Sequence, residues 1–289
     1  MKLNSFKKNY GLLLVLGIIW GSSFILMKKG IIVFSTNEVA MLRLGIAWLT
    51  LLPFTYKSIK RIPKKAWKPL AIVGFFGNGI PAFLFTEAQS VLDSSLIGIL
   101  NALVPLFTFI IAVFVFKTKW KIYNLVGIFI GLMGAIWLIA GVGLVLDQAH
   151  YAWLIVIATL CYSISLNTIK VYLQKMSSIQ ISSFAFMFVG PPCILGLAFS
   201  DFYPTLMSTK GSWQALFYIT ILAVLGTSVA LVLFNKLVKN STAIFASSVT
   251  YLIPIIAVFW GIIDGEQISI NHFLAIGIIF TGIYLVNKK

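Results

Sequence analysis

Carboxylates, histidines and cysteines are scarce in this chain of 289 residues, which has seven Asp and Glu against 22 Lys and Arg, two His and two Cys. Cys161 and Cys193 lie inside apolar stretches and show no metal-ligand spacing, so we expect no disulfide, metal or cofactor. No motif links His150 or His272 to a carboxylate or a serine. The sequence therefore contains no motif that indicates an enzyme.

A phosphate-binding loop of the form G-x-x-x-x-G-K-[ST] is also missing, which excludes ATP as the direct energy source. Long polar stretches are lacking too, so little of the chain remains for a soluble domain. Most of the chain is apolar instead: 60% of the residues are hydrophobic and the mean hydropathy is +1.01.

Ten apolar stretches of roughly the 20 residues that span a bilayer core predict ten transmembrane helices. They lie at about 11–28, 38–56, 68–90, 94–116, 122–143, 151–169, 178–199, 213–235, 241–262 and 268–286. The fold class we predict is an all-α membrane protein that forms one transmembrane domain over residues 1–289.

The sign of the charge alternates from one gap between stretches to the next. Nearly all Lys and Arg fall on the side of the N-terminus, whereas the carboxylates fall on the far side, where only Lys28, Lys29 and Lys210 accompany them. By the positive-inside rule we expect a multi-pass protein of the cytoplasmic membrane with both termini in the cytoplasm. The net charge of +15 then serves orientation and contact with anionic membrane lipid, and we expect no nucleic-acid partner.

The chain contains an internal repeat. The run LVPLFTFIIAVF in the fourth stretch resembles YLIPIIAVFW in the ninth, so Pro105 corresponds to Pro254, 149 residues later. The same offset aligns Gly77 with Gly226 in the preceding stretches. We infer a duplication of one five-helix unit.

We assign repeat A to about 1–146 and repeat B to about 147–289. Because five is odd, the second repeat must enter the membrane from the opposite side. Inverted repeats of this kind are typical of secondary transporters, whose site lies near the midplane between the repeats.

Several features together resemble the drug/metabolite transporter superfamily, in its ten-helix EamA-type branch. They are WGSSF at 20–24, Arg43 in the second stretch, the helices centred on Pro105 and Pro254, and the Gly-rich fifth and tenth stretches. The resemblance implies a carrier of small molecules that works by alternating access, often an exporter of amino acids, other metabolites or toxic compounds. A flippase of a lipid-linked substrate and a non-transporting membrane interaction protein are the alternatives.

The turn between the last two helices differs between the halves. Members of the resembled family usually carry an acidic residue there, and the second half has Glu266. The first half instead has Lys117-Thr118-Lys119, which fits the cytoplasmic location that we expect for that turn.

Helix breaks point to the binding region. Pro105 and Pro254 cannot donate to the carbonyls of Asn101 and Thr250, and a Gly-Asn-Gly-Ile-Pro run ending at Pro81 interrupts the third stretch. Equivalent breaks in both repeats point to a binding region, and kinks that only aid helix packing are the alternative. From these breaks and the polar and aromatic residues beside them, the candidate substrate-binding residues are Trp20, Ser23, Phe24, Asn78, Asn101, Tyr162, Asn167, Thr227, Ser228, Thr250 and Tyr251.

Two ionisable residues, Arg43 and Glu87, fall within helical stretches, where such residues are functional suspects. We expect them to pair with each other, or Arg43 to extend toward the outer headgroups. The alternative makes Glu87 a proton-coupling carboxylate, with protons as the coupling ion. Glu87 is nine residues from Asn78, which places the two on opposite faces of an unbroken helix and favours the pairing.

Overall fold

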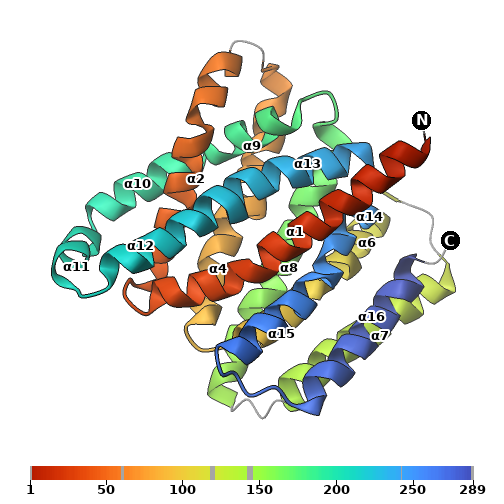
Figure 1. The fold of residues 1–289 in the computed structure, drawn as a ribbon. Helices are drawn as coiled ribbons and strands as arrows, with labels where there is room; N and C mark the ends of the chain where they lie inside the picture. Colours follow the sequence, from red (N-terminus) through yellow and green to blue (C-terminus); the bar gives the residue numbers. More distant parts are fainter. Residues whose placement is uncertain (1, 60–61, 118–120, 142–145, 242, 288–289) are drawn as a thin grey trace.

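The computed structural model describes residues 2–59, 62–117, 121–141, 146–241 and 243–287, and these form helices joined by short turns (Figure 1). Within those ranges, eight helical segments are long and apolar enough to cross a membrane. Two shorter apolar helices, at Ile122–Trp137 and Ile270–Gly282, complete the set of ten. The all-helical membrane fold is therefore confirmed.

Repeat A supplies the first five spans. They are α1 (Lys2–Ile31); α2 (Thr36–Ser58); a third made of η2 (Lys64–Ala66), α3 (Trp67–Gly74), η3 (Phe75–Gly79) and α4 (Ile80–Gln89); a fourth made of α5 (Ser94–Leu100), η4 (Asn101–Leu103) and α6 (Val104–Phe114); and α7 (Ile122–Gly141).

Repeat B supplies the rest. The spans are α8 (Leu146–Tyr172); a seventh made of α9 (Ser178–Phe186) and α10 (Gly190–Ala198); an eighth made of α12 (Ser212–Ile221), η5 (Leu222–Val229) and α13 (Ala230–Asn240); a ninth made of α14 (Ala243–Ser247), η6 (Ser248–Tyr251) and α15 (Ile253–Ile263); and α16 (Ile270–Asn287). A short helix, α11 (Phe202–Ser208), joins the seventh span to the eighth.

The helix breaks occur at matching positions in the two repeats. The third and eighth spans each contain a π-helical segment, η3 and η5, and the fourth and ninth each contain a 3₁₀ segment, η4 and η6. Pro81, Pro105 and Pro254 all occupy the first turn of the α-helix that follows a break, where a missing N–H is tolerated. The breaks expected from the sequence are thus present in both halves.

One break was not anticipated. The seventh span, expected as a continuous stretch, is interrupted between Phe186 and Gly190, and α10 starts with Pro191 in its first turn. Two successive prolines leave the carbonyls before them without helical donors, so the chain turns there before it resumes as α10. The corresponding helix of repeat A, α2, is continuous.

The two repeats pack against each other reciprocally. A Cβ at Gly77, in the third span, would collide with Ser165 of α8, which is the first helix of repeat B. A Cβ at Gly226, in the eighth span, would collide with Ser23 of α1, which is the first helix of repeat A. The third helix of each repeat therefore lies close against the first helix of the other, as expected for two inverted copies.

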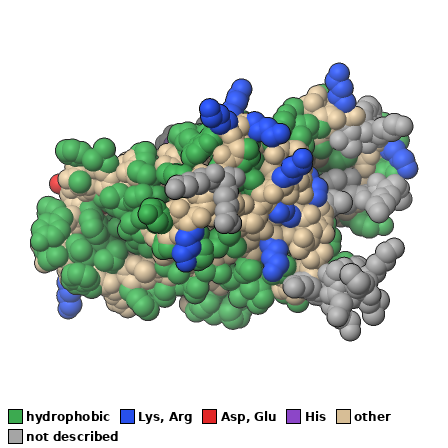
Figure 2. All heavy atoms as spheres, turned by 90° about the horizontal axis from the view of Figure 1, so that it is seen from above, with side chains coloured by type: hydrophobic (Ala, Val, Ile, Leu, Met, Phe, Trp, Pro, Cys, Tyr) green, Lys and Arg blue, Asp and Glu red, His purple; other side chains and the backbone are tan. Residues whose placement is uncertain are grey.

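Charge and apolar surface are separated on the outside of the molecule. Large apolar side chains such as Phe114, Phe199 and Trp213 are exposed along the helices, as lipid-facing residues are. Figure 2, which looks down on the molecule of Figure 1, shows most of the visible Lys and Arg side chains over the centre and right of that face and hydrophobic side chains over its left. We call the end of the helices that carries Lys170 and Lys239 the lysine-rich end, and the end that carries Asp264 and Glu266 the carboxylate-rich end.

Candidate substrate cavity

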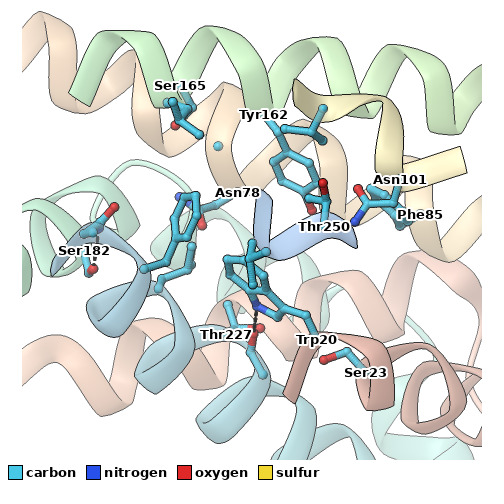
Figure 3. Close-up of a pocket in the computed structure, with 18 of the residues that line it drawn as sticks. Trp20, Ser23, Asn78, Phe85, Asn101, Tyr162, Ser165, Ser182, Thr227 and Thr250 are labelled. Atoms are coloured by element: carbon cyan, nitrogen blue, oxygen red, sulfur yellow. Dashed lines mark hydrogen bonds between the residues drawn. The ribbon is translucent and has the colours of Figure 1, made fainter. Parts of the chain in front are cut away.

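A cavity of about 110 Å³ lies between the two repeats. Its lining comes from the broken spans and from α1, α2, α8 and α9, and Figure 3 shows the labelled side chains converging from these separate helices. The predicted site residues that line it are Trp20, Ser23, Phe24, Asn78, Asn101, Tyr162, Thr227 and Thr250. Their contact with a substrate remains a prediction.

The π-helical segments place two polar side chains at matching positions. Asn78 donates from Nδ2 to the carbonyl of Val73 at 3.0 Å, and Thr227 donates from Oγ1 to the carbonyl of Leu222 at 3.1 Å, each five residues earlier in the chain. The two residues are 149 positions apart, so they are equivalents in the duplication. Each side chain satisfies a backbone oxygen of its own widened turn, which keeps the break stable in an apolar setting.

Arg43 reaches into the cavity from α2. Its Nε donates to Thr227 Oγ1 at 2.9 Å, and the guanidinium also interacts with the phenolic oxygen of Tyr162. The side chain is partly accessible and lines the cavity. Arg43 therefore joins the second helix of repeat A to the π-helical segment of repeat B at the site itself.

The expected pairing of Arg43 with Glu87 is wrong. Glu87 accepts a hydrogen bond from Thr36 Oγ1 at 2.6 Å and does not line the cavity. Thr36 is the first residue of α2, seven residues before Arg43. The Arg43 guanidinium is instead held by Thr227 and Tyr162, about 10 Å further along the helix axis at 1.5 Å per residue, so the two charges have different partners. Arg43 does not extend toward the headgroups either.

Aromatic side chains form one wall of the cavity. Phe85 stacks on Phe24 with ring centroids 5.9 Å apart and on Tyr162 at 5.7 Å, so the three rings form a row. Trp20 donates from Nε1 to the carbonyl of Gly226 at 2.9 Å, within the π-helical segment of repeat B. The wall thus offers apolar aromatic surface, and its indole is oriented by the helix break.

Two amide side chains in the lining keep an unused acceptor. The Oδ1 atoms of Asn101 and Asn235 are buried without a hydrogen-bond partner. The Asn235 amide nitrogen donates to Ser182 Oγ at 2.9 Å. Buried acceptors without donors are costly, and both residues belong to the lining of the same cavity.

Three predicted site residues do not line this cavity. Asn167 donates to the carbonyl of Thr108 at 3.2 Å, Ser228 shares a 2.6 Å hydrogen bond with Thr50, and the Tyr251 ring packs 5.6 Å from that of Phe280. The polar groups of Asn167 and Ser228 and the ring of Tyr251 serve contacts between helices, which spacing along one helix does not distinguish from contacts with a cavity. The three prolines, Pro81, Pro105 and Pro254, are buried and also lie outside the lining.

Sequence reasoning missed several lining residues on the seventh and eighth spans. Ser182, Leu231 and Phe234 all line the cavity. Phe234 packs edge-on against Trp20 with centroids 5.0 Å apart. A signal was present for Ser182, because Ser182-Ser183 is a polar pair inside an apolar stretch, but only the fold shows which of the two faces inward.

Ion pairs link helices at the carboxylate-rich end. Lys28 lies 2.8 Å from Asp264 and 2.9 Å from Glu266, and Lys29 lies 2.6 Å from Asp264. These four residues, which we call the ion cluster, join the end of α1 to the turn between α15 and α16. Two of the lysines that departed from the positive-inside pattern are thus neutralised by carboxylates.

Glu266 also binds the start of α5. Its two oxygens accept the backbone N–H groups of Ser94 at 2.9 Å and Ser95 at 3.1 Å, and its side chain is only 1% exposed. Burial raises the pKa of Glu266, but the hydrogen bonds from Lys28 and from these N–H groups outweigh burial and hold it below its ordinary value. Hydrogen bonds from Lys28 and Lys29 likewise lower the pKa of Asp264.

Comparison with known proteins agrees with this architecture. The model of the EamA-like transporter family matches twice, over residues 7–140 and 150–288, so each half of the chain is one copy of the family's unit. A solved protein crystal structure superposes with a TM-score of 0.68 at 14% identity over 97% of this chain and 96% of that one, which shows the shared fold.

Two curated relatives match this chain over nearly the whole length of both proteins. Uncharacterized transporter YoaV of Bacillus subtilis (strain 168) is 26% identical over 274 residues, 93% of this chain and 92% of the relative. Uncharacterized inner membrane transporter YedA of Escherichia coli (strain K12) is 27% identical over 288 residues, 96% of this chain and 90% of the relative. With two family matches covering both repeats, the chain belongs to the EamA-like transporter family, whose members are membrane transporters and not enzymes.

Proposed function

We propose that this protein is a secondary exporter that moves a small organic solute out across the cytoplasmic membrane by alternating access. The observation that carries the proposal is the cavity between the repeats, lined by residues at matched helix breaks of both. Broken helices around a midplane site, contributed by two inverted units, are the arrangement that lets one unit rock against the other around a bound solute.

The ion cluster at the carboxylate-rich end supports a state that loads from the cytoplasm. Phe85 and Arg43 mark the part of the cavity nearer the carboxylate-rich end, and Ser182 and Asn235 mark the part nearer the lysine-rich end. Beyond the first part, the ion cluster joins α1 to the turn between α15 and α16, and we take this end to be the closed one. With the lysine-rich end in the cytoplasm, as the positive-inside rule favours, the closed end faces outward. The relative YedA is named as an inner membrane protein, which supports the same membrane.

A solute carrier fits the cavity better than a lipid flippase. A phosphate-bearing lipid needs a basic pocket and a lateral opening to the bilayer. Among the lining residues that the structure describes, Arg43 is the sole cation. The stacked rings of Phe24, Phe85 and Tyr162 form one wall of the cavity. The non-transporting alternative is excluded by the family.

Transport by the purified protein tests the proposal. A thermal-shift screen against amino acids, nucleosides, sugars and hydrophobic cations first identifies a ligand, because a ligand that binds the folded state raises the Tm. Proteoliposomes preloaded with that ligand should then show counterflow of its labelled form. Asn101→Ala and Thr250→Ala should slow counterflow while leaving folded yield unchanged, whereas Phe199→Ala, at a side chain 85% exposed, should be neutral. Translocation of a lipid headgroup without solute counterflow would instead establish the flippase.

A further inference from the structure

The cavity carries one uncompensated positive charge. Arg43 is the sole lining residue with a full charge at neutral pH among those that the structure describes, and its partners there are the neutral oxygens of Thr227 and Tyr162. The ion pairs within the described part of the chain involve Lys28 and Lys29. A charged side chain inside a membrane protein is costly unless an opposite charge compensates it.

The guanidinium retains hydrogen-bonding capacity. Arginine has five N–H donors in a planar fork, of which the Nε–H is used by Thr227. Tyr162 takes a further hydrogen bond of the guanidinium. Both partners hold the plane in place from different helices, α8 and η5, so the fork is positioned before any solute arrives. A carboxylate is the group that such a fork binds best, through two parallel hydrogen bonds.

A second, independent observation concerns acceptors. The amide oxygens of Asn101 and Asn235 are buried and unpartnered, and the two side chains, 6% and 3% exposed, line the same cavity. Water or a solute that carries an N–H or O–H donor would satisfy them. The row of Phe24, Phe85 and Tyr162 then provides an apolar wall for the rest of the molecule.

We propose that the solute of this cavity is an organic anion whose carboxylate binds Arg43, whose hydroxyl or amine donor is accepted by Asn101 or Asn235, and whose apolar body lies against the aromatic wall. This inference rests on the proposed function, because it names the substrate class of the same cavity. It sets a requirement on charge: the neutral amide of the same acid, or an amine of the same size, binds poorly.

A matched series of probes tests the charge requirement on the unmodified protein. The probes are 3-phenylpropionate, its neutral amide, 2-phenylethylamine, and 3-phenyllactate, which adds one hydroxyl donor to the first. Affinities come from the concentration dependence of the Tm in detergent. The acid should bind about tenfold or more tightly than the amide, because a charge-assisted hydrogen-bond pair is lost. 3-Phenyllactate should bind more tightly than 3-phenylpropionate.

Substitutions then assign the contacts. Arg43→Gln should remove the preference for acid over amide, and Arg43→Lys should restore part of it. Asn101→Ala should remove the preference for 3-phenyllactate over 3-phenylpropionate and keep that for acid over amide. If Arg43→Gln does not fold, Thr227→Val and Tyr162→Phe provide the alternative test. Each keeps the charge of Arg43 but removes a hydrogen bond that positions its guanidinium, so each should weaken binding of the acids. Phe199→Ala, on the exposed surface, is the matched control.

The results separate this inference from the transport proposal. Equal binding of the amide or the amine, or no binding of either acid, would overturn the anion site. Counterflow of a neutral or cationic solute without binding of the acids would likewise overturn it and leave the exporter proposal intact. Binding of the acids with the predicted dependence on Arg43, but without counterflow of any solute, would support the site and overturn transport.

Discussion

The two ends of the helix bundle are held together by different chemistry. At the carboxylate-rich end, the ion cluster joins α1 of repeat A to the turn between α15 and α16 of repeat B. At the lysine-rich end, Lys170 of α8 donates to the carbonyls of Val238 at 3.1 Å and Ser241 at 2.5 Å, and Lys239 donates to the carbonyl of Met176. Charge pairs hold one end, and lysines that cap carbonyls hold the other.

The difference lies in which parts are joined. The ion cluster ties one repeat to the other, whereas the lysine contacts tie α13 to α8 and to the turn before α9, all within repeat B. At the lysine-rich end the repeats meet through apolar contacts such as Trp67 with Phe184, 5.8 Å between centroids, and through neutral hydrogen bonds such as that from Thr55 Oγ1 to the carbonyl of Ser183 at 3.4 Å. If transport requires one repeat to rock against the other, the ion pairs of the ion cluster must break, whereas the lysine contacts can stay intact. We therefore call the ion cluster, together with its hydrogen bonds to Ser94 and Ser95, the latch.

The largest effect should follow removal of the carboxylate at the centre of the latch. Glu266→Ala leaves Lys28 and the N–H groups of Ser94 and Ser95 without their acceptor, so we expect a loss of about 3 kcal/mol, measured as a lower Tm in detergent. Asp201→Asn, at an exposed position of the same end, is the matched control and should change stability by less than about 0.5 kcal/mol. Equal losses in the two variants would show that the latch adds nothing.

Acid should weaken the latch. The pKa values of Glu266 and Asp264 are lowered from ordinary values of 4.5 and 3.8, so the folded protein binds fewer protons there than the unfolded chain does. Their stabilisation is complete above those ordinary values and is lost as the pH falls below them through the lowered ones. The difference in Tm between the unmodified protein and Glu266→Gln should therefore shrink between pH 5 and pH 3. A difference that stays constant over that range would contradict the assignment.

A smaller effect is expected at the lysine-rich end. Lys170→Met removes hydrogen bonds from one ammonium to two carbonyls at the end of α13, which should cost about 1 kcal/mol. Since these contacts lie within repeat B, the variant should leave the accessibility of the cavity from the carboxylate-rich end unchanged. Increased accessibility from that end would mean that the lysine contacts also hold the repeats together.

The smallest effect should come from a carboxylate near the latch but outside it. Glu87→Gln keeps an oxygen that can accept from Thr36, so stability and counterflow should both stay within error of the unmodified protein. Gradient-driven accumulation should also persist, because Glu87 does not line the cavity. A well-folded variant that exchanges solute but cannot concentrate it would instead establish Glu87 as the proton carrier.

The sequence predicted the fold well because each apolar stretch and each break has a local cause. The helix breaks are marked by residues at the breaks themselves, namely the prolines at 105 and 254 and the glycines at 77 and 226. Because the chain is duplicated, each of these signals occurs at the same position in both repeats. By the same reasoning Gly190-Pro191-Pro192 could have been recognised as a break in the seventh span, yet it has no counterpart in α2 to draw attention to it.

Contacts between helices were less predictable. Arg43 and Glu87 lie at comparable depths in the sequence pattern, but depth does not fix the direction in which a side chain leaves its helix, and the two point to different partners. Lys28 and Glu266 were correctly placed on one side, but 238 residues separate them. Their pairing depends on how α1 packs against α15, which no local signal contains.

Side-specific labelling of one cavity residue tests the central claim, that the ion cluster closes the cavity at the outer end. With Cys161→Ser and Cys193→Ala as the background, Leu231→Cys places a thiol in the lining. An impermeant anionic thiol reagent should label it in inside-out vesicles and not in intact cells. Adding Glu266→Ala, or independently Lys28→Met, should make it reactive in intact cells as well. Labelling in intact cells with the cluster unaltered, or no gain in either variant, would contradict the account.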